Sequence, residues 1–416
     1  MSKHVVVIGT GVIGLSVAYY CMRRGYRVTV IERHSQERSG CSHGNMGMVV
    51  PSHFIPLAAP GMISLGLKWM WNPESPFYIK PRLSWDLLTW GIRFCSAANR
   101  RHVARSAPLL RDLSLASRTL FEELEAGGLE FGLKKKGLLM LCKTARALEE
   151  EAHVAEHARQ LGIPAEVLDR KQVAEREPGV EMNVSGAVFF PKDCHLQPES
   201  FLTALEQQVV LGGGEILWST EVRVWKRDGK RLAAAITSEG EIAADEFVIC
   251  GGSWSPAVVH DLGLRLPMQA GKGYSLTLTE PRERPQICSI LTEARVAVTP
   301  MGDSLRFGGT MEIAGMNEEI SARRVRGIIR AATEYYPAFS EKDFEHTPAW
   351  CGLRPCSPDG MPYIGRTAAA SNLSIATGHA MMGLSLAPVT GQIIAQTIAG
   401  EKPVVDVTLL SPDRYG

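Results

Sequence analysis

Residues 4–32 read HVVVIGTGVIGLSVAYYCMRRGYRVTVIE, and this stretch decides the fold. Its first five residues form an apolar, largely β-branched run, which predicts a buried strand. Residues 12–24 have a helical pattern, and residues 27–31 form a second apolar run. The stretch therefore predicts a strand, a tight turn, a helix and a second strand, in that order.

The turn between the first strand and the helix has glycine at positions 9, 11 and 14. Gly9 permits a sharp turn, Gly11 lets backbone N–H groups approach a pyrophosphate, and Gly14 lets the helix pack closely on the sheet. The phosphates would then lie at the positive end of the helix dipole. Glu32 stands where a carboxylate accepts hydrogen bonds from ribose hydroxyls, and an acid there disfavours a 2′-phosphate. The stretch predicts a site for FAD or NAD without choosing between them.

The length and composition limit the class of protein. A chain of 416 residues predicts two or three domains, and a net charge of +1 with 21% charged residues gives no indication of a nucleic-acid partner. Because the first predicted strand begins at residue 4, we expect no signal peptide, and no apolar run reaches the length of about 18 that a membrane span needs. The nine cysteines are scattered without a C-x-x-C, which favours reduced thiols in a cytoplasmic compartment.

The rest of the chain divides by its patterns. Residues 41–47, CSHGNMG, are small and polar and predict either a cofactor-lining loop or a plain loop. Residues 51–61 hold several prolines, which predict a connector out of the first domain. Residues 246–249 predict a buried parallel strand that runs into CGGSW, a second place where backbone could touch a nucleotide. Residues 264–349 predict mixed strands and one helix, an α+β pattern.

The region of residues 68–111 interleaves aromatic and basic side chains. It carries four of the eight tryptophans, and eight Lys or Arg stand against two acids; the tryptophans are Trp69, Trp71, Trp85 and Trp90. Such a region suits a membrane surface or a hydrophobic partner. The alternative interpretation is a domain core with a solvated basic rim.

Residues 153–157, HVAEH, match the H-x-x-E-H pattern of inverted zinc peptidases. We expect no metal site there, because Glu149, Glu150 and Glu151 predict a solvated helix face and no further ligand cluster follows closely.

Several motifs together resemble the FAD-dependent amine and amino-acid oxidoreductases, a family that includes glycine oxidase, sarcosine oxidase and the bacterial D-amino-acid dehydrogenases. The matching segments are residues 9–32, 42–45, 248–254, 352–365 and 378–383, which span nearly the whole chain. Residues 56–61, 68–70 and 273–275 look most like the D-amino-acid dehydrogenase branch. The resemblance implies a Rossmann-like FAD-binding domain made of residues 1–55, 192–262 and 350–416. It also implies an α+β substrate domain on a mixed antiparallel sheet, made of residues 56–191 and 263–349.

The resemblance implies FAD rather than NAD, with the pyrophosphate on the glycine turn, the ribose on Glu32 and the adenine near the Val222 backbone. Residues 42–47 and 378–384 would surround the flavin. The cofactor residues expected on this basis are Gly9, Gly11, Val12, Ile13, Gly14, Glu32, Arg33, Ser42, His43, Gly44, Asn45, Met46, Gly47, Val222, Gly251, Gly252, Trp254, Gly352, Gly378, Met382, Gly383, Leu384 and Ser385. Some members attach flavin covalently, but Cys351 is offset from the cysteine position, so we expect non-covalent FAD with His43 hydrogen-bonded to it.

Arg354 is similar to the arginine that holds the substrate carboxylate in this family, and a guanidinium suits that task because it binds carboxylate bidentately. The alternative is a structural arginine paired with Asp359. Tyr274 is expected to help bind the carboxylate, and His53 and His379 to shape or polarise the pocket. A second arginine that glycine-oxidase-like members carry after the Gly-His pair is replaced here by Ala380-Met381-Met382, which weakens a glycine oxidase assignment.

The expected reaction is oxidative deamination of a small amino acid, either a D-amino acid or a cyclic imino acid such as D-proline or hydroxyproline. Hydride would pass from Cα to flavin N5, and the electrons would go to a quinone or another acceptor that is not O₂. Residues 68–111 are suited to peripheral contact with the inner membrane. Two alternatives share every motif: an O₂-using oxidase that produces peroxide, and a flavin-binding electron-transfer subunit without turnover. The sequence does not fix the substrate side chain, its enantiomer or the oligomeric state.

Overall fold

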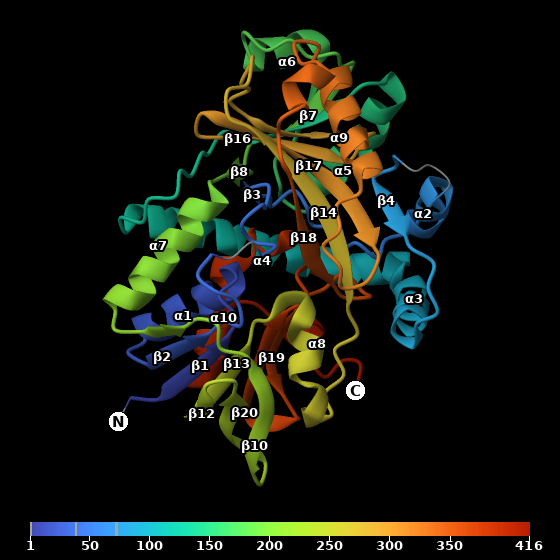
Figure 1. Cartoon of the computed structure of the whole chain (residues 1–416). Coiled ribbons are helices and arrows are strands. Elements are labelled where there is room, and N and C mark those ends of the chain that lie inside the picture. Colours follow the sequence, from blue (N-terminus) through green and yellow to red (C-terminus); the bar gives the residue numbers. More distant parts are fainter. Residues whose placement is uncertain (1, 38–39, 71–73) are drawn as a thin grey trace.

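The computed structural model describes residues 2–37, 40–70 and 74–416, which fold around two β-sheets (Figure 1). The first sheet has six strands in the order β19-β20-β13-β1-β2-β9. Its strands are β1 (His4–Ile8), β2 (Arg27–Ile31), β9 (Glu215–Leu217), β13 (Glu246–Ile249), β19 (Tyr363–Thr367) and β20 (Ala370–Thr377). All neighbours pair in parallel except β19 and β20, which pair antiparallel.

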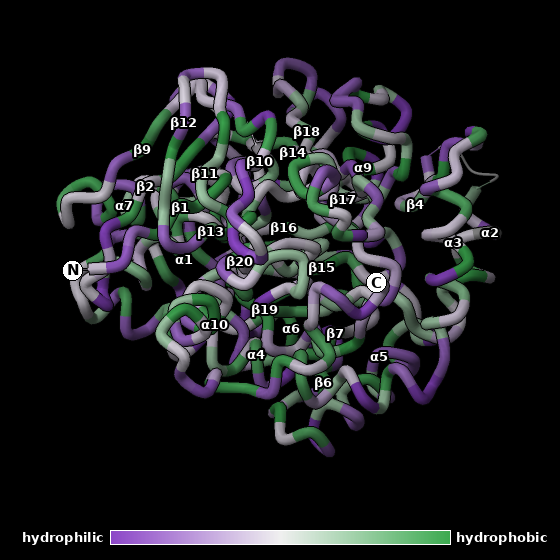
Figure 2. The backbone as a smooth tube through the Cα atoms, turned by 90° about the horizontal axis from the view of Figure 1, so that it is seen from below, coloured by the Kyte–Doolittle hydropathy of each residue, from purple (hydrophilic) through white to green (hydrophobic). Residues whose placement is uncertain are grey.

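Both faces of this sheet are covered, which explains why β1 is buried at every position. Helices α1 (Val12–Arg23), α7 (Pro198–Leu211) and α10 (Ala387–Ala399) share one apolar core with the sheet. A Cβ on Gly391 of α10 would lie 2.6 Å from the Ser16 carbonyl oxygen of α1, so these two helices pack with little space between them. The opposite face carries a meander of β10 (Val222–Asp228), β11 (Arg231–Thr237) and β12 (Gly240–Ala243), where Trp225 packs on Phe247. Seen from below, the β10 segment of this meander is largely hydrophilic (Figure 2).

The second sheet is larger and mixed, in the order β18-β14-β17-β16-β15-β5-β7-β6, with β4 beside β17. Its strands are β4 (Phe77–Ile79), β5 (Leu138–Cys142), β6 (Glu166–Asp169), β7 (Gly186–Phe190), β14 (Gln269–Leu278), β15 (Cys288–Leu291), β16 (Val296–Met301), β17 (Ser304–Ile313) and β18 (Ala349–Cys356). Most neighbours are antiparallel, and β5–β15 and β4–β17 are parallel. The helices of this half are α2 (Met62–Met70), α3 (Trp85–Ala97), α5 (Ala145–Gln160), α6 (Arg170–Arg176) and α9 (Ala322–Tyr335).

Two features connect the sheets. Helix α4 (Arg100–Ala126) runs between the two halves in Figure 1, and its Leu113 and Phe121 belong to the same core as α10. The short strands β3 (Met48–Val49) and β8 (Cys194–His195) pair with each other where the chain passes between the sheets. The predicted fold class, a Rossmann-like domain with a mixed-sheet second domain, is confirmed.

The predicted domain boundaries stay a prediction. The six-stranded sheet does collect strands from residues 4–31, 215–249 and 363–377, as a discontinuous domain requires. Strand β18, however, pairs with β14 in the larger sheet. The pairing runs from Gln269 opposite Cys356 to Leu276 opposite Ala349. Residues 350–356, which the sequence assigned to the first domain, therefore share the sheet of the second.

Candidate active site

A cavity of about 960 Å³ lies between the two sheets and takes walls from both. This volume is at the upper end of the range for small-molecule sites, so the cavity has room for a ligand of cofactor size. The first sheet contributes the turn after β1, the end of β2 and the turn after β13, and the second contributes β14, β17 and β18. Residues 41–46 and 379–384 also line the cavity.

The three glycines after β1 have different surroundings. Gly9 has a φ of +111°, and a Cβ there would lie 2.7 Å from the Cys250 carbonyl oxygen. A Cβ on Gly14 would lie 1.8 Å from the carbonyl oxygen of Gly9. A Cβ on Gly11 would meet only the Ser42 Oγ, at 3.5 Å. Gly9 and Gly14 are therefore required by internal packing, whereas Gly11 leaves space on the cavity side of the α1 N-terminus.

Glu32 and Arg33 directly follow strand β2 and line the cavity. The Glu32 carboxylate accepts hydrogen bonds from the Thr10 backbone N–H at 2.9 Å and from the Thr10 hydroxyl at 2.8 Å. It also accepts one from the His34 backbone N–H at 3.0 Å. Arg33 lies over the Trp254 ring at 4.0 Å from its centroid. These bonds fix the carboxylate beside the glycine turn, where the sequence predicts a ribose.

The loop of residues 42–47 is held in place by a residue that the sequence analysis missed. Arg306 on β17 donates to the Asn45 carbonyl at 2.8 Å and to the His43 carbonyl at 3.3 Å. A second guanidinium nitrogen, Nη2, donates to Glu199 Oε1 at 2.8 Å. Nothing in the local sequence indicates this role, because Arg306 is more than 250 residues away and reaches the loop only through the fold.

These observations fit a dinucleotide such as FAD. The α1 N-terminus faces the cavity, Gly11 leaves room for a phosphate group, and Val12 N–H already points outward to the Ser42 Oγ at 3.1 Å. On the other side of the β1 turn, Gly251 and Gly252 line the same wall. Backbone donors and a fixed carboxylate are the groups that a pyrophosphate and a ribose need.

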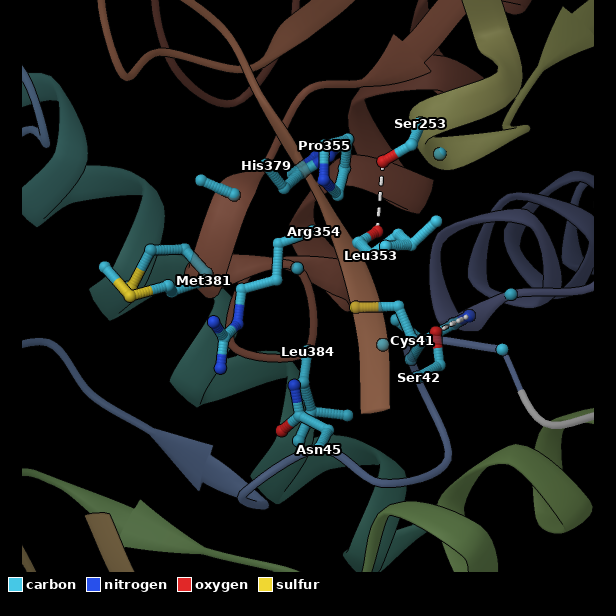
Figure 3. Close-up of a pocket in the computed structure, with 18 of the residues that line it drawn as sticks. Cys41, Ser42, Asn45, Ser253, Leu353, Arg354, Pro355, His379, Met381 and Leu384 are labelled. Atoms are coloured by element: carbon cyan, nitrogen blue, oxygen red, sulfur yellow. Dashed lines mark hydrogen bonds between the residues drawn. The ribbon is translucent and has the colours of Figure 1, made fainter. Parts of the chain in front are cut away.

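Arg354 extends from β18 into the space between Met381 and Asn45 (Figure 3). One guanidinium nitrogen donates to the Thr310 carbonyl at 2.6 Å, and no carboxylate of the described residues forms an ion pair with it. A Cβ on Gly273 would lie 2.1 Å from the guanidinium, so glycine at 273 makes room for this side chain. Asp359 instead binds Arg414 at 2.8 and 3.1 Å. The alternative pairing of Arg354 with Asp359 is therefore wrong.

Tyr274 lines the cavity but directs its hydroxyl elsewhere. The hydroxyl donates to Glu312 Oε2 at 2.5 Å, and Lys272 Nζ lies 4.0 Å from the same oxygen. Burial, together with this carboxylate, raises the pKa of Tyr274 well above its ordinary value. The Tyr274 hydroxyl donates its proton in the hydrogen bond to Glu312. Tyr274 could therefore help to bind a substrate carboxylate only if that hydrogen bond were broken.

The two predicted histidines both line the cavity, and burial lowers the pKa of both side chains. Burial lowers the pKa of His379 to about 3, and its Nε2 lies 3.0 Å from the Thr390 hydroxyl. Burial, with a smaller effect from Arg295, lowers the pKa of His53 to about 4. His53 Nδ1 lies 3.0 Å from the Ser52 hydroxyl.

Most of the predicted cofactor residues lie on the cavity wall, and the exceptions stand directly behind it. The residues off the wall are Gly14, Gly47, Gly378 and Ser385. Gly47 has a φ of +66° and Gly378 one of +78°, so both have backbone reasons to be glycine. Ser385 Oγ accepts a hydrogen bond from the Val50 backbone N–H at 3.1 Å.

One sequence expectation about α5 is wrong. Glu151 does not lie on a solvated face: it is 8% exposed, and it lines the cavity with Arg295. Burial raises its pKa, which Arg295 partly offsets. The three-and-four spacing of the buried Ala147, Ala155 and Ala158 places Glu151 on the inner face, and that spacing could have indicated its burial. His153 and His157 stand on this same helix, where His157 packs edge-on against Phe54.

The aromatic–basic region divides between the interior and the surface. Trp90 is 4% exposed and donates its ring N–H to the Cys356 carbonyl, and Trp69 lines the cavity. Trp85, by contrast, is 78% exposed. Trp71 lies outside the described residues. The region is thus partly core, as one interpretation expected, and partly an exposed apolar surface.

The fold and the cavity define a dinucleotide-binding protein whose cavity is also lined by an arginine, Arg354, that forms no ion pair among the described residues. Residues 4–397 match the family model described as DAO, FAD dependent oxidoreductase. The chain belongs to this family, and FAD is its cofactor.

Comparisons with individual proteins agree. The chain is 31% identical to a D-amino acid dehydrogenase of Bradyrhizobium diazoefficiens, with 99% of this chain and 98% of that protein covered. It is 32% identical to a D-amino acid dehydrogenase of Sinorhizobium medicae, with 99% and 100% covered. Among solved structures, glycine oxidase from Geobacillus kaustophilus matches with a TM-score of 0.79 at 23% identity, covering all of both chains. L-proline dehydrogenase from P. horikoshii matches with a TM-score of 0.77 at 20% identity, covering 100% of this chain and 98% of that chain. The structural matches show the fold.

Proposed function

We propose that this protein catalyses FAD-dependent oxidative deamination of a small amino acid, a D-amino acid or a cyclic imino acid, and that Arg354 binds the substrate carboxylate. The observation that carries the proposal is the Arg354 guanidinium. It lies in the cavity, contacts only a backbone carbonyl among hydrogen-bond acceptors of the described residues, and has space reserved for it by Gly273. The proposal agrees with relatives that bear the name D-amino acid dehydrogenase.

Bound FAD would accept the hydride that leaves the substrate Cα. Arg354 would orient the carboxylate and thereby fix the position of Cα. Apolar wall residues such as Met46 and Leu384 would exclude water from the reacting carbon. Arg306 would keep the loop of residues 42–47 against the cofactor through the carbonyls of His43 and Asn45. We propose that FAD is non-covalently bound, so acid precipitation should leave the protein colourless and the supernatant yellow.

The direct test is anaerobic reduction of the flavin by candidate substrates. The purified holoenzyme is mixed with D- and L-amino acids, including the isomers of proline and hydroxyproline, and the visible flavin absorbance is followed. We expect bleaching by one enantiomeric series and none by the corresponding keto acids. Absence of bleaching with every amino acid would contradict the proposal and favour an electron-transfer subunit.

For the electron acceptor we propose a quinone or another acceptor that is not O₂. The support is the name dehydrogenase borne by the relatives. In air without another acceptor, we expect slow turnover and little peroxide. Addition of a soluble quinone should raise the rate of turnover. Stoichiometric peroxide in air would favour the oxidase alternative.

The exposed part of residues 68–111 supports contact with a membrane surface. Trp85, Leu88 and Ile92 are 78%, 51% and 61% exposed and recur on one side of α3 with helical spacing, and Leu83 just before the helix is fully exposed. Basic residues outnumber acids around them. No helix among the described residues is long and apolar enough to cross a bilayer. We therefore propose peripheral binding through the apolar side of α3 to anionic lipid.

This contact is testable by sedimentation with vesicles of anionic phospholipid at low salt. We expect Leu88→Glu with Ile92→Glu to lower the bound fraction at least about fivefold, because two apolar contacts become like charges at an anionic surface. The matched control is Val210→Glu with Leu211→Glu on α7, where both side chains are also exposed. Equal loss in both double variants, or no retention of the unmodified protein, would contradict the proposal.

A further inference from the structure

Asp193 is a completely buried carboxylate that neither cofactor binding nor carboxylate anchoring uses. Its Oδ1 accepts a hydrogen bond from the Ser52 backbone N–H at 3.1 Å, and its Oδ2 accepts one from the Ser52 hydroxyl at 2.5 Å. No lysine or arginine of the described residues forms an ion pair with it. Burying a carboxylate that forms no ion pair is costly, even with the more distant positive charge of Arg118, and buried carboxylates of this kind cluster at functional sites.

Ser52 connects this carboxylate to the cavity. Its Oγ lies 3.0 Å from His53 Nδ1, and His53 lines the cavity that holds Arg354. A serine hydroxyl has one proton, and when the proton goes to Asp193 the oxygen can only accept from Nδ1. The chain of bonds therefore runs from His53 Nδ1–H to Ser52 to Asp193. In the neutral ring Nε2 then carries the lone pair, and no side chain of the described residues bonds to it.

We propose that Asp193 and Ser52 are positioning residues that hold His53 as the Nδ1–H tautomer, so that His53 Nε2 accepts a hydrogen bond from the amino group of the substrate. The inference rests on the proposed function, because it assumes an amino acid whose carboxylate is on Arg354. Arg354 and His53 would then hold the two polar groups of one substrate from different segments of the chain. The low pKa of His53, which burial keeps near 4, maintains the ring as a neutral acceptor.

A purely structural role for Asp193 makes different predictions from this one. Burial raises the pKa of Asp193 to about 7, opposed by the two Ser52 hydrogen bonds and by the positive charge of Arg118, so the tests belong at about pH 8.5, where the carboxylate is ionised. Asp193→Asn keeps an oxygen for the Ser52 backbone N–H but donates from its amide nitrogen to Ser52 Oγ. The Ser52 hydroxyl must then donate to His53 Nδ1, which places the ring proton on Nε2. Ser52→Ala removes the connection, and Ser52→Thr retains it.

The first measurement is the tautomer itself, by two-bond ¹H–¹⁵N correlation on FAD-loaded protein labelled with ¹⁵N-histidine. His53→Gln assigns the signal. We expect the Nδ1–H tautomer in the unmodified protein and in Ser52→Thr, and the Nε2–H tautomer in Asp193→Asn. An Nε2–H ring in the unmodified protein, or a tautomer that Asp193→Asn leaves unchanged, would overturn the proposal. This readout needs no turnover.

The second measurement compares pyrrole-2-carboxylate, which presents a ring N–H, with furan-2-carboxylate, which has an oxygen there. Binding is followed by perturbation of the flavin spectrum. We expect the unmodified protein and Ser52→Thr to prefer the pyrrole by about threefold to tenfold, the value of one hydrogen bond, and Asp193→Asn and Ser52→Ala to lose the preference. If the unmodified protein bound the pyrrole and the furan with equal affinity, the proposed hydrogen bond to His53 Nε2 would be overturned.

The same titrations separate this inference from the proposed function. Arg354→Ala should weaken the binding of pyrrole-2-carboxylate and of furan-2-carboxylate by the same factor, and it should leave the His53 tautomer unchanged. If Arg354→Ala has no effect while the pyrrole preference persists, the carboxylate anchor fails and the His53 contact stands. If neither carboxylate perturbs the flavin, the proposed amino-acid site fails, and with it the contact to the substrate amine.

Discussion

Arg354→Ala should lower kcat/KM for the amino-acid substrate by roughly 30-fold to several thousand-fold while FAD remains bound. Removing one partner of a buried, charge-assisted contact costs about 2–5 kcal/mol, and most of the loss should be in KM because the anchor is already used in the ground state. The measurement is steady-state kinetics with the substrate found by flavin bleaching, together with the flavin-to-protein absorbance ratio. An unchanged KM would contradict the anchor.

Gly273→Ala is the matched variant for this prediction. A Cβ at 273 would lie 2.1 Å from the Arg354 guanidinium, which is the movable end of a long side chain. The guanidinium should shift without unfolding the protein, so we expect a raised KM with all groups of Arg354 still present. If Gly273→Ala matched the unmodified protein while Arg354→Ala did not, the position of the guanidinium would not matter and only its charge would.

Gly11→Val should abolish or severely weaken FAD binding in a protein that still folds. A Cβ at 11 meets only the Ser42 Oγ at 3.5 Å, so the fold without cofactor tolerates it, but the new side chain occupies the space beside the α1 N-terminus. We expect the FAD dissociation constant to rise at least about 100-fold, which corresponds to roughly 2.7 kcal/mol. The measurement is quenching of free-FAD fluorescence on titration with apoprotein.

Gly14→Val provides the contrast. Its Cβ would lie 1.8 Å from the backbone oxygen of Gly9, which cannot move without disturbing β1. Overpacking of this kind costs about 1–3 kcal/mol or more, so we expect a lowered unfolding midpoint of the apoprotein. A destabilised Gly11→Val apoprotein, or a normal Gly14→Val apoprotein, would contradict the different roles given to these glycines.

The opening strand, turn, helix and strand could be predicted because their signals are local. The apolar run at 4–8 and the glycine spacing have the same meaning wherever they occur, and the structure has β1, α1 and β2 at those positions. Arg354 was found through a family motif, since nothing in its local pattern marks a carboxylate anchor. The burial of Glu151 was missed because its acidic neighbours on α5 suggested a solvated helix, although the inward alanines have the spacing of a buried face.

The sequence by itself determined the dinucleotide turn, the class of fold and the residues that carry the family resemblance. Only the tertiary structure decided what those residues touch. It paired Asp359 with Arg414 and left Arg354 to the Thr310 carbonyl. It also placed the buried Asp193 behind Ser52. The physical reason is that backbone conformation and hydrophobic periodicity are encoded over a few residues. Hydrogen-bond partners and charge pairs, by contrast, join residues that are 44, 55 and 141 positions apart in these three cases, and they meet only when the chain has folded.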